Sequence, residues 1–156
     1  MTPAFEPDPR LAQDSQLLAQ GPLSQLRLMD DLRFPWLVLV PRLPGAIEWL
    51  DLEVAQQQLL LDELNAAAAL LRAWAPCDKL NIGALGNIVR QLHVHLVARR
   101  EGDVAWPGPV WGAGSMIGCV YQSTFLQFEG SAQRRDPTRR IEPHCWELRC
   151  GLGRIV

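Results

Sequence analysis

Two of the three histidines in this chain lie two residues apart, inside an otherwise apolar segment. Residues 91–97 have the sequence Gln-Leu-His-Val-His-Leu-Val, which places the imidazoles at His93 and His95. Because side chains alternate between the two faces of a strand, these imidazoles and the Gln91 amide share one face, and aliphatic side chains take the other. An imidazole can act as nucleophile, hydrogen-bond donor or metal ligand near neutral pH. The segment therefore predicts a functional site on one face of a strand.

Three interpretations of the pair are open from the residues alone. His93 and His95 could be polar side chains on a solvated strand, two ligands of a zinc ion, or a catalytic pair. The other zinc donors that the sequence offers, His144 and four cysteines, show no spacing typical of metal ligands. The sequence also has no phosphate-binding glycine loop and no serine nucleophile elbow. The residues alone leave these interpretations open.

The same segment resembles the signature of the histidine-triad (HIT) family of nucleotide hydrolases and transferases, His-x-His-x-His followed by two apolar residues. Gln91 stands at the first position of the triad, and His93 and His95 stand at the second and third. Trp106-Pro107-Gly108 is similar to the Trp-Pro segment that follows the triad in one branch of the family. Residues 28–42 are similar to the family's first conserved strands.

This resemblance implies a mechanism and a role for each residue of the triad. His93 would be the nucleophile that bonds to phosphorus, with its second nitrogen held by a backbone carbonyl. His95 would donate to a phosphate oxygen, and Gln91 would shape the hydrogen bonds without titrating near neutral pH. A histidine nucleophile needs no metal-bound water, so we expect neither a tightly bound metal nor a cofactor.

Two functions follow as hypotheses. The first is a HIT-like hydrolase or transferase that acts at the α-phosphorus of a nucleoside phosphoramidate or dinucleoside polyphosphate, through a nucleotidyl-histidine intermediate. The second is a nucleotide-binding module with little turnover, because Gln91 replaces the first histidine. In both cases the partner is a small nucleotide.

The resemblance also implies residues that contact the substrate. Asn81 and Asn87 fall where the family places polar side chains that touch the phosphates. Asp30, preferred over Asp31, falls where a carboxylate accepts from the ribose hydroxyls. Trp36 stands where many members have another histidine, and would make the nucleotide pocket more aromatic. From the residues alone, the two aspartates also suit a turn, Asn87 suits a turn after Gly86, and Trp36 suits the core.

Hydrophobic periodicity predicts an α+β domain in which one long helix covers an antiparallel sheet. Asp51 is expected to cap the helix, and Pro76 to end it. Residues 2–22 suggest a short helical turn followed by an irregular segment. The predicted elements are strands over 23–29 and 36–40, a helix over 51–74, and strands over 79–84 and 88–99.

Length and charge limit the possible classes of protein. A chain of 156 residues with 15 basic and 17 acidic side chains fits a single HIT-like domain, expected over residues 5–112. The balanced charge gives no reason to expect nucleic acid or a membrane surface as partner. The start of the chain lacks the pattern of a signal peptide, which predicts a cytoplasmic protein. Residues 113–156, with net charge +2 from six arginines and four acids, are expected to be partly disordered or to dock on a partner subunit.

The expected assembly is a homodimer in which two sheets join across a two-fold axis, as is common in the HIT family. Trp106, Val110 and Trp111 follow the histidine strand directly and are expected to be exposed anchors at the interface or at the pocket rim.

Overall fold

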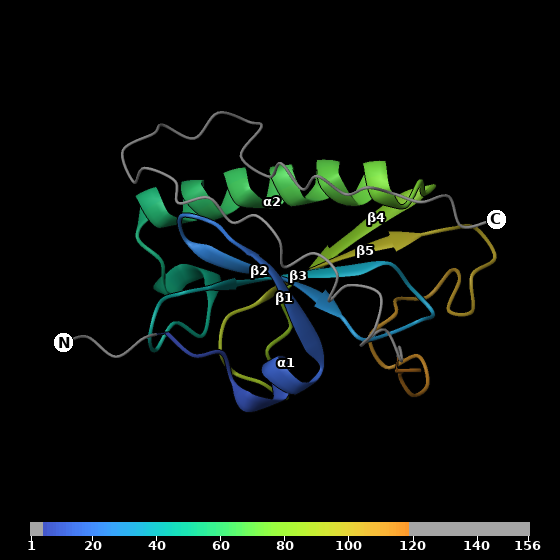
Figure 1. Cartoon of the computed structure of the whole chain (residues 1–156), viewed down its shortest axis with the longest axis horizontal. Coiled ribbons are helices and arrows are strands. Elements are labelled where there is room, and N and C mark those ends of the chain that lie inside the picture. The colour runs from blue at the N-terminus through green and yellow to red at the C-terminus, as the bar shows by residue number, and fades with distance from the viewer. Residues whose placement is uncertain (1–4, 119–156) are drawn as a thin grey trace, which may run out of the picture.

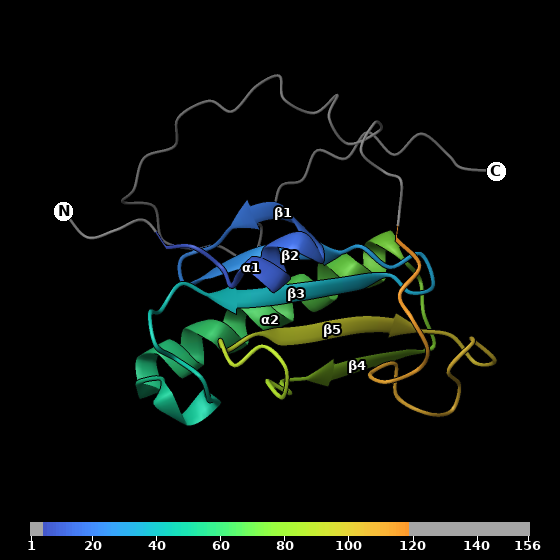
Figure 2. The ribbon, with the colours of Figure 1, turned by 90° about the horizontal axis from the view of Figure 1, so that it is seen from below.

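The computed structural model describes residues 5–118, which form a five-stranded antiparallel sheet with a long helix across one face (Figure 1). The strand order is β1-β2-β3-β5-β4, as Figure 2 shows from the side away from the long helix. This confirms the predicted α+β architecture. The elements are α1 (Pro9–Gln13), β1 (Ser15–Gln20), β2 (Ser24–Met29), β3 (Trp36–Pro41), a 3-10 turn (Trp49–Asp51), α2 (Val54–Trp74), β4 (Lys79–Gly83) and β5 (Val94–Arg99).

A core cluster lies between α2 and the sheet. The apolar residues of α2 recur every three or four positions, so they form one stripe that faces the sheet. Their partners are alternate residues of β2, β3 and β5. The residues buried in this layer include Leu60, Leu64, Ala67 and Leu71 from the helix and Leu26, Leu37, Leu39, Val94 and Leu96 from the sheet.

A second, smaller cluster lies on the opposite face of the sheet, where α1 packs (Figure 1). Val38 and Val97 contribute from the central strands, Leu11 contributes from α1, and Val110 contributes from the segment after β5. Asp8 caps α1 by accepting from the Arg10 N–H at 2.9 Å. This face carries the two histidines.

The N-terminal segment contains an edge strand that the sequence analysis did not predict. The helical turn expected there is α1, but residues 15–20 form β1 rather than an irregular segment. β1 pairs antiparallel with β2, and the register shifts between Leu17 and Ala19. Because an edge strand exposes most of its side chains, β1 lacks the alternating apolar pattern by which strands are recognised in a sequence.

The long helix begins later than predicted. Glu53, not Asp51, is the residue before its first turn. Asp51 instead ends the 3-10 turn, where its carboxylate accepts from the N–H groups of Ile47 and Glu48, both at 2.8 Å. These two bonds keep the pKa of Asp51 below its ordinary value. The end of the helix at Trp74, two residues before Pro76, is as predicted.

The histidine strand is shorter than predicted, because β5 begins at Val94 instead of residue 88. Gly86, with φ +67°, turns the chain out of β4 into a loop. Ile88 within this loop is exposed, and Leu92 returns to the core by donating its N–H to the Ala46 carbonyl at 2.9 Å. The prediction counted the apolar residues at 88 and 89 as part of the strand, whereas they belong to the loop.

Candidate active site

His93 and His95 lie on the face of the sheet opposite α2, as the alternation predicts. His93 immediately precedes β5, and His95 is the second residue of the strand, between Val38 of β3 and Gly83 of β4. The imidazole centroids are 4.7 Å apart and the ring planes are nearly perpendicular, at 84°. The two residues are only 6% and 7% exposed. The strand therefore brings the two rings together in a mostly desolvated environment.

A backbone carbonyl fixes the tautomer of His93. The Nδ1 atom of His93 lies 2.6 Å from the carbonyl oxygen of Gln91. Since a carbonyl oxygen can only accept, Nδ1 carries the proton in this contact. The neutral ring therefore has its lone pair on Nε2, the arrangement that a nucleophilic histidine requires.

An indole fixes the tautomer of His95 in the opposite sense. The Nε1–H of Trp36 donates to His95 Nδ1 at 3.0 Å. Since an indole nitrogen can only donate, His95 Nδ1 carries the lone pair and Nε2 carries the proton. Adjacent imidazoles thus have complementary Nε2 atoms: an electron pair on His93 and a hydrogen-bond donor on His95.

His95 remains a neutral donor over the physiological pH range. Burial and, to a smaller extent, the neighbouring His93 together lower the pKa of His95 to about 3. A group with this pKa is uncharged at neutral pH. His95 can therefore stabilise a developing negative charge by hydrogen bonding but not as an imidazolium.

Trp36 and Trp111 surround the His95 ring with aromatic groups. The ring centroids of Trp36 and Trp111 lie 5.3 and 5.8 Å from that of His95. Gly83 makes room for this packing, because a Cβ at that position would lie 3.0 Å from the Trp111 ring. Trp36 is 5% exposed, so its indole acts on His95 and presents little surface of its own.

The side chain of Gln91 is directed to the N-terminal segment. Its Oε1 accepts from the N–H of Asp8 at 2.7 Å, which connects the loop before β5 to the start of α1. The main chain of Gln91 holds His93, as described above. The contact that sets the tautomer of His93 is therefore made by the main chain of residue 91 and does not depend on its side chain.

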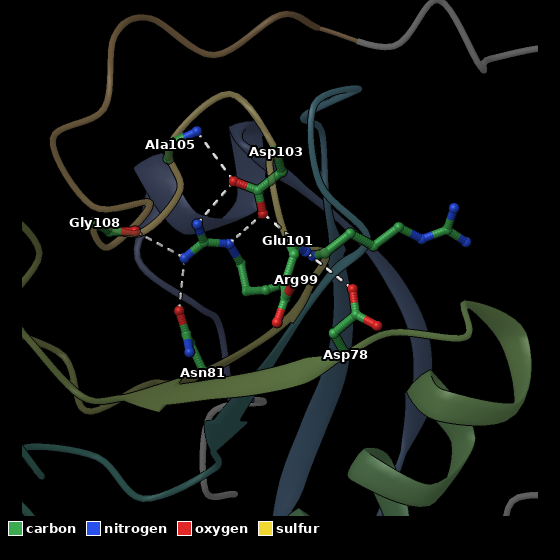
Figure 3. A network of polar contacts seen from close by, with 8 residues as sticks. Asp78, Asn81, Arg99, Glu101, Asp103, Ala105 and Gly108 are labelled. Carbon is green, nitrogen blue, oxygen red and sulfur yellow. Dashed lines mark hydrogen bonds and ion pairs between the residues drawn. The ribbon is translucent and has the colours of Figure 1, made fainter.

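Asn81 lies on the same sheet face as His95 but is bonded to a buried arginine. Its register partner on β5 is Val97, two residues beyond His95. The Oδ1 atom of Asn81 accepts from an Arg99 Nη1 at 2.7 Å (Figure 3). The structure thus places Asn81 in a network centred on Arg99, with its amide oxygen already engaged.

Asn87 lies in the loop that follows β4. Asn87 follows Gly86 and is exposed. A small hollow next to this loop is lined by Gly86, His93 and Glu48, among others. Asn87 thus directly follows Gly86, which lines the same hollow as His93. Within the described residues, the Asn87 side chain makes no hydrogen bond.

The two candidate ribose ligands differ in how they are engaged. Asp31 is buried and forms a salt bridge with Arg33 at 2.7 Å. Despite desolvation, which acts in the opposite direction, this pairing keeps the pKa of Asp31 below its ordinary value. Asp30 is half-buried, at the end of β2. Asp31 is thus a structural residue of the turn, and the preference for Asp30 as ribose ligand stays a prediction.

In the segment after β5, Trp106, Val110 and Trp111 were predicted to be exposed, and the structure differs from this prediction. Val110 is buried in the core cluster of this sheet face, and Trp111 is half-buried against it. Trp106 is partly exposed and precedes a cis peptide bond to Pro107. The expectation of exposure is wrong for Val110, because the segment folds back onto the sheet and covers the second cluster.

Comparisons with known proteins place this geometry in a family. A family model described as the HIT domain matches residues 10–102. The chain belongs to the HIT family. HIT proteins are typically nucleotide hydrolases or transferases. Among curated proteins, a search finds none that matches the chain significantly.

Solved structures of histidine triad proteins have the same fold. One from Bradyrhizobium japonicum is 45% identical, with a TM-score of 0.74 over 80% of this chain and 92% of its own. One from Sinorhizobium meliloti is 50% identical, with a TM-score of 0.72 over 74% of this chain and 85% of its own. One from Marinobacter aquaeolei is 42% identical, with a TM-score of 0.71 and the same two coverages.

Sequence reasoning missed three features of this HIT domain. The bond from Trp36 to His95 joins residues 59 positions apart, and no local pattern indicates it. The contact between Gly83 and Trp111 was signalled only by a glycine inside a strand, which often marks a close approach. Arg99 was signalled by a charge at the end of an apolar strand, with Asp103 four residues later.

Metal-ligand groups and membrane-spanning helices can be assessed for residues 5–118. Within residues 5–118, no three His, Cys, Asp or Glu side chains group together as metal ligands do. His144, the third histidine, lies outside these residues. No helix in the same region is long and apolar enough to cross a membrane.

Proposed function

We propose that this HIT protein is a nucleotide hydrolase or transferase that acts at the α-phosphorus of a nucleoside phosphoramidate or dinucleoside polyphosphate. The observation that supports this most strongly is the opposite tautomers of His93 and His95. One Nε2 offers an electron pair, and the other offers a proton to an oxygen of the group under attack.

The proposed reaction has two steps. The electron pair on His93 Nε2 forms a bond to phosphorus, and the bond to the leaving group breaks with its electron pair going to that group. Water, or the hydroxyl of another acceptor in a transferase, then attacks phosphorus and releases its proton to solvent, and the electron pair of the N–P bond returns to Nε2. Throughout, the Gln91 carbonyl holds the Nδ1 proton and stabilises the positive charge that the ring acquires. His95 donates to a non-bridging oxygen.

The second candidate is a nucleotide-binding module with little turnover. The observation that favours it is the glutamine at the first triad position, whose side chain accepts from Asp8. If a histidine is needed there to move a proton, binding would persist while turnover would be slow. Gln91→His should then raise turnover.

Calorimetry with AMP or GMP, together with a hydrolysis assay on both substrate classes, separates the two candidates. Enzyme function predicts product formation by the wild type and none by His93→Ala. Tight binding without product over hours would favour the module, and equal activity in wild type and His93→Ala would end the enzyme proposal. Running the assay in excess EDTA tests the metal-free chemistry, since activity lost to EDTA and restored by zinc would instead support a zinc site.

We further propose a homodimer that forms through the β4 edge of the sheet. β4 ends the strand order, so one side of its main chain has no neighbouring strand among the described residues. Ile82 on this strand is 51% exposed, and Leu85 in the following loop is also exposed. Light scattering at micromolar concentration should give the mass of two chains, and a monomeric mass would count against the dimer.

A further inference from the structure

The geometry points to a specific task for Trp36: we propose that it is a positioning residue that locks His95 as an Nε2–H donor. The inference rests on the proposed function, because it concerns how His95 serves the reaction at His93. It assigns Trp36 no contact with substrate. The observation that carries it is the 3.0 Å hydrogen bond from the indole Nε1–H to His95 Nδ1.

Within the described residues, neither the Trp36 Nε1–H nor His95 Nδ1 has another hydrogen-bond partner. Trp36 is the first residue of β3, and its register partner on β5 is Val97, so the indole reaches diagonally to His95. Trp36 and His95 are both buried. In such a setting an unpaired indole N–H or imidazole nitrogen costs free energy, and the bond satisfies both at once.

The lock restricts what His95 can do in the reaction. To pass its Nε2 proton to a leaving group and remain neutral, an imidazole must gain a proton at Nδ1. Here Nδ1 faces an N–H donor, which cannot supply a proton under reaction conditions. His95 is therefore a fixed donor to a phosphate oxygen, and the leaving group takes its proton from solvent.

The low pKa of His95 agrees with the same geometry. Burial and the nearby His93 ring both disfavour a charged His95. An indole N–H pointing at Nδ1 would also oppose a second ring proton there. Together these effects keep the donor neutral, so its strength should not change across the pH range in which ordinary histidines titrate.

Nitrogen-15 NMR of the imidazole rings tests the lock directly in the unmodified protein and needs no substrate. The expected spectrum has His95 Nδ1 unprotonated and Nε2 protonated, with His93 showing the reverse. A His95 ring protonated at Nδ1, or one that exchanges between tautomers, would overturn the proposal. This measurement does not depend on any variant folding, nor on whether the protein turns over a nucleotide.

Trp36→Phe then removes the donor while keeping an aromatic ring in the core. We expect His95 to populate both tautomers and kcat to fall roughly tenfold, with KM little changed. Trp36→His, which restores a ring N–H, should recover part of the lost kcat. If Trp36→Phe leaves His95 in a single Nε2–H tautomer, or shifts the tautomer without lowering kcat, the positioning role is refuted.

Trp111→Phe is the matched control. Trp111 is an indole at a similar distance from the His95 ring, 5.8 Å between centroids, but its own Nε1 has no hydrogen-bond partner within the described residues. This substitution removes the same atoms from the same aromatic cluster without removing the bond. His95 should keep its tautomer in Trp111→Phe, so a tautomer change in both variants would attribute the effect to packing and overturn the proposal.

The outcomes separate this inference from the proposed function. A locked tautomer in a protein that binds nucleotides without turnover would refute the enzyme and leave the structural lock intact, with its catalytic consequence removed. If the enzyme is active but the His95 tautomer is unchanged in Trp36→Phe, the role of Trp36 is refuted and the proposed nucleophile at His93 is unaffected.

Discussion

β5 carries two polar centres on one face of the sheet, and they are built in opposite ways. At its beginning, His93 and His95 are held by single neutral hydrogen bonds to a carbonyl and an indole. At its end, Arg99 is 1% exposed and makes four hydrogen bonds, to Asp103, Asn81 and the Gly108 carbonyl (Figure 3). The first centre leaves an Nε2 atom on each ring for a ligand, whereas the second uses nearly all its donors internally.

The difference shows how one strand can serve stability and chemistry at once. The paired hydrogen bonds between Arg99 and Asp103 raise the pKa of the arginine and lower the pKa of the aspartate, so both remain charged. The rings of Phe34 and Trp106 lie 5.6 and 5.7 Å from the guanidinium. This centre fixes the loop after β5, which returns Trp111 to His95.

The largest effect is expected from breaking the charged centre. Arg99→Met leaves Asp103 and Asn81 without their partner, and a buried pair broken on one side typically loses about 3 kcal/mol of unfolding free energy. Urea denaturation measures this loss. Arg100→Met is the matched control, because Arg100 is exposed and should change stability by less than about 0.5 kcal/mol. Equal stabilities of the two variants would contradict the role given to Arg99.

Substitutions at the neutral centre, His93 and His95, should lower activity more than stability. His95→Ala removes the proposed donor to the phosphate oxygen, and losing one such donor lowers kcat by about a hundredfold or more. His95→Gln should recover part of that loss, because an amide can accept from Trp36 with its oxygen and donate with its nitrogen. Steady-state kinetics on a nucleoside phosphoramidate measure both. Unchanged kcat in His95→Ala would remove His95 from the mechanism.

The low pKa of His95 predicts a loss of stability in mild acid. Below pH 6.5 the unfolded chain binds a proton at this residue, and the folded chain does not until about pH 3. The unfolding free energy should therefore fall as pH decreases, by at most about 1.4 kcal/mol per pH unit from this group. Denaturation between pH 6.5 and 4.5, above the range in which most carboxylates titrate, measures the slope. His95→Gln should reduce it, and an identical slope in the two proteins would contradict the shift.

The smallest effect is expected at Gln91. Gln91→Ala removes the bond from Asp8, worth about 1 kcal/mol, but keeps the carbonyl that holds His93. Turnover should stay near that of the wild type while stability falls slightly. A loss of kcat as large as in His95→Ala would mean that the Gln91 side chain takes part in the reaction.

The sequence predicted those parts of the molecule that depend on local periodicity. Alternation placed His93 and His95 opposite Leu92 and Val94, and the apolar stripe located α2, since both patterns repeat over a few residues. The assignment of Gln91, His93 and His95 to triad positions came from the resemblance to the family and stays a prediction.

The remaining features depend on contacts between distant residues. β1 was missed because an edge strand is defined by its main-chain pairing with β2 and not by buried side chains. The bond from Trp36 to His95 and the network around Arg99 need the assembled sheet before their partners meet. For Asn81, the resemblance to the family suggested a contact with phosphate, whereas the folded structure shows its amide oxygen bonded to Arg99.

Detection of a covalent nucleotidyl group on His93 tests the central claim most directly. Wild-type protein mixed with a nucleoside phosphoramidate should be quenched in base, where N–P bonds survive, and digested for mass spectrometry. The account predicts one added nucleotidyl group on the peptide that contains His93, formed and lost within the time of turnover, and none in His93→Ala. Turnover by the wild type with no adduct at His93, or turnover retained by His93→Ala, would contradict it.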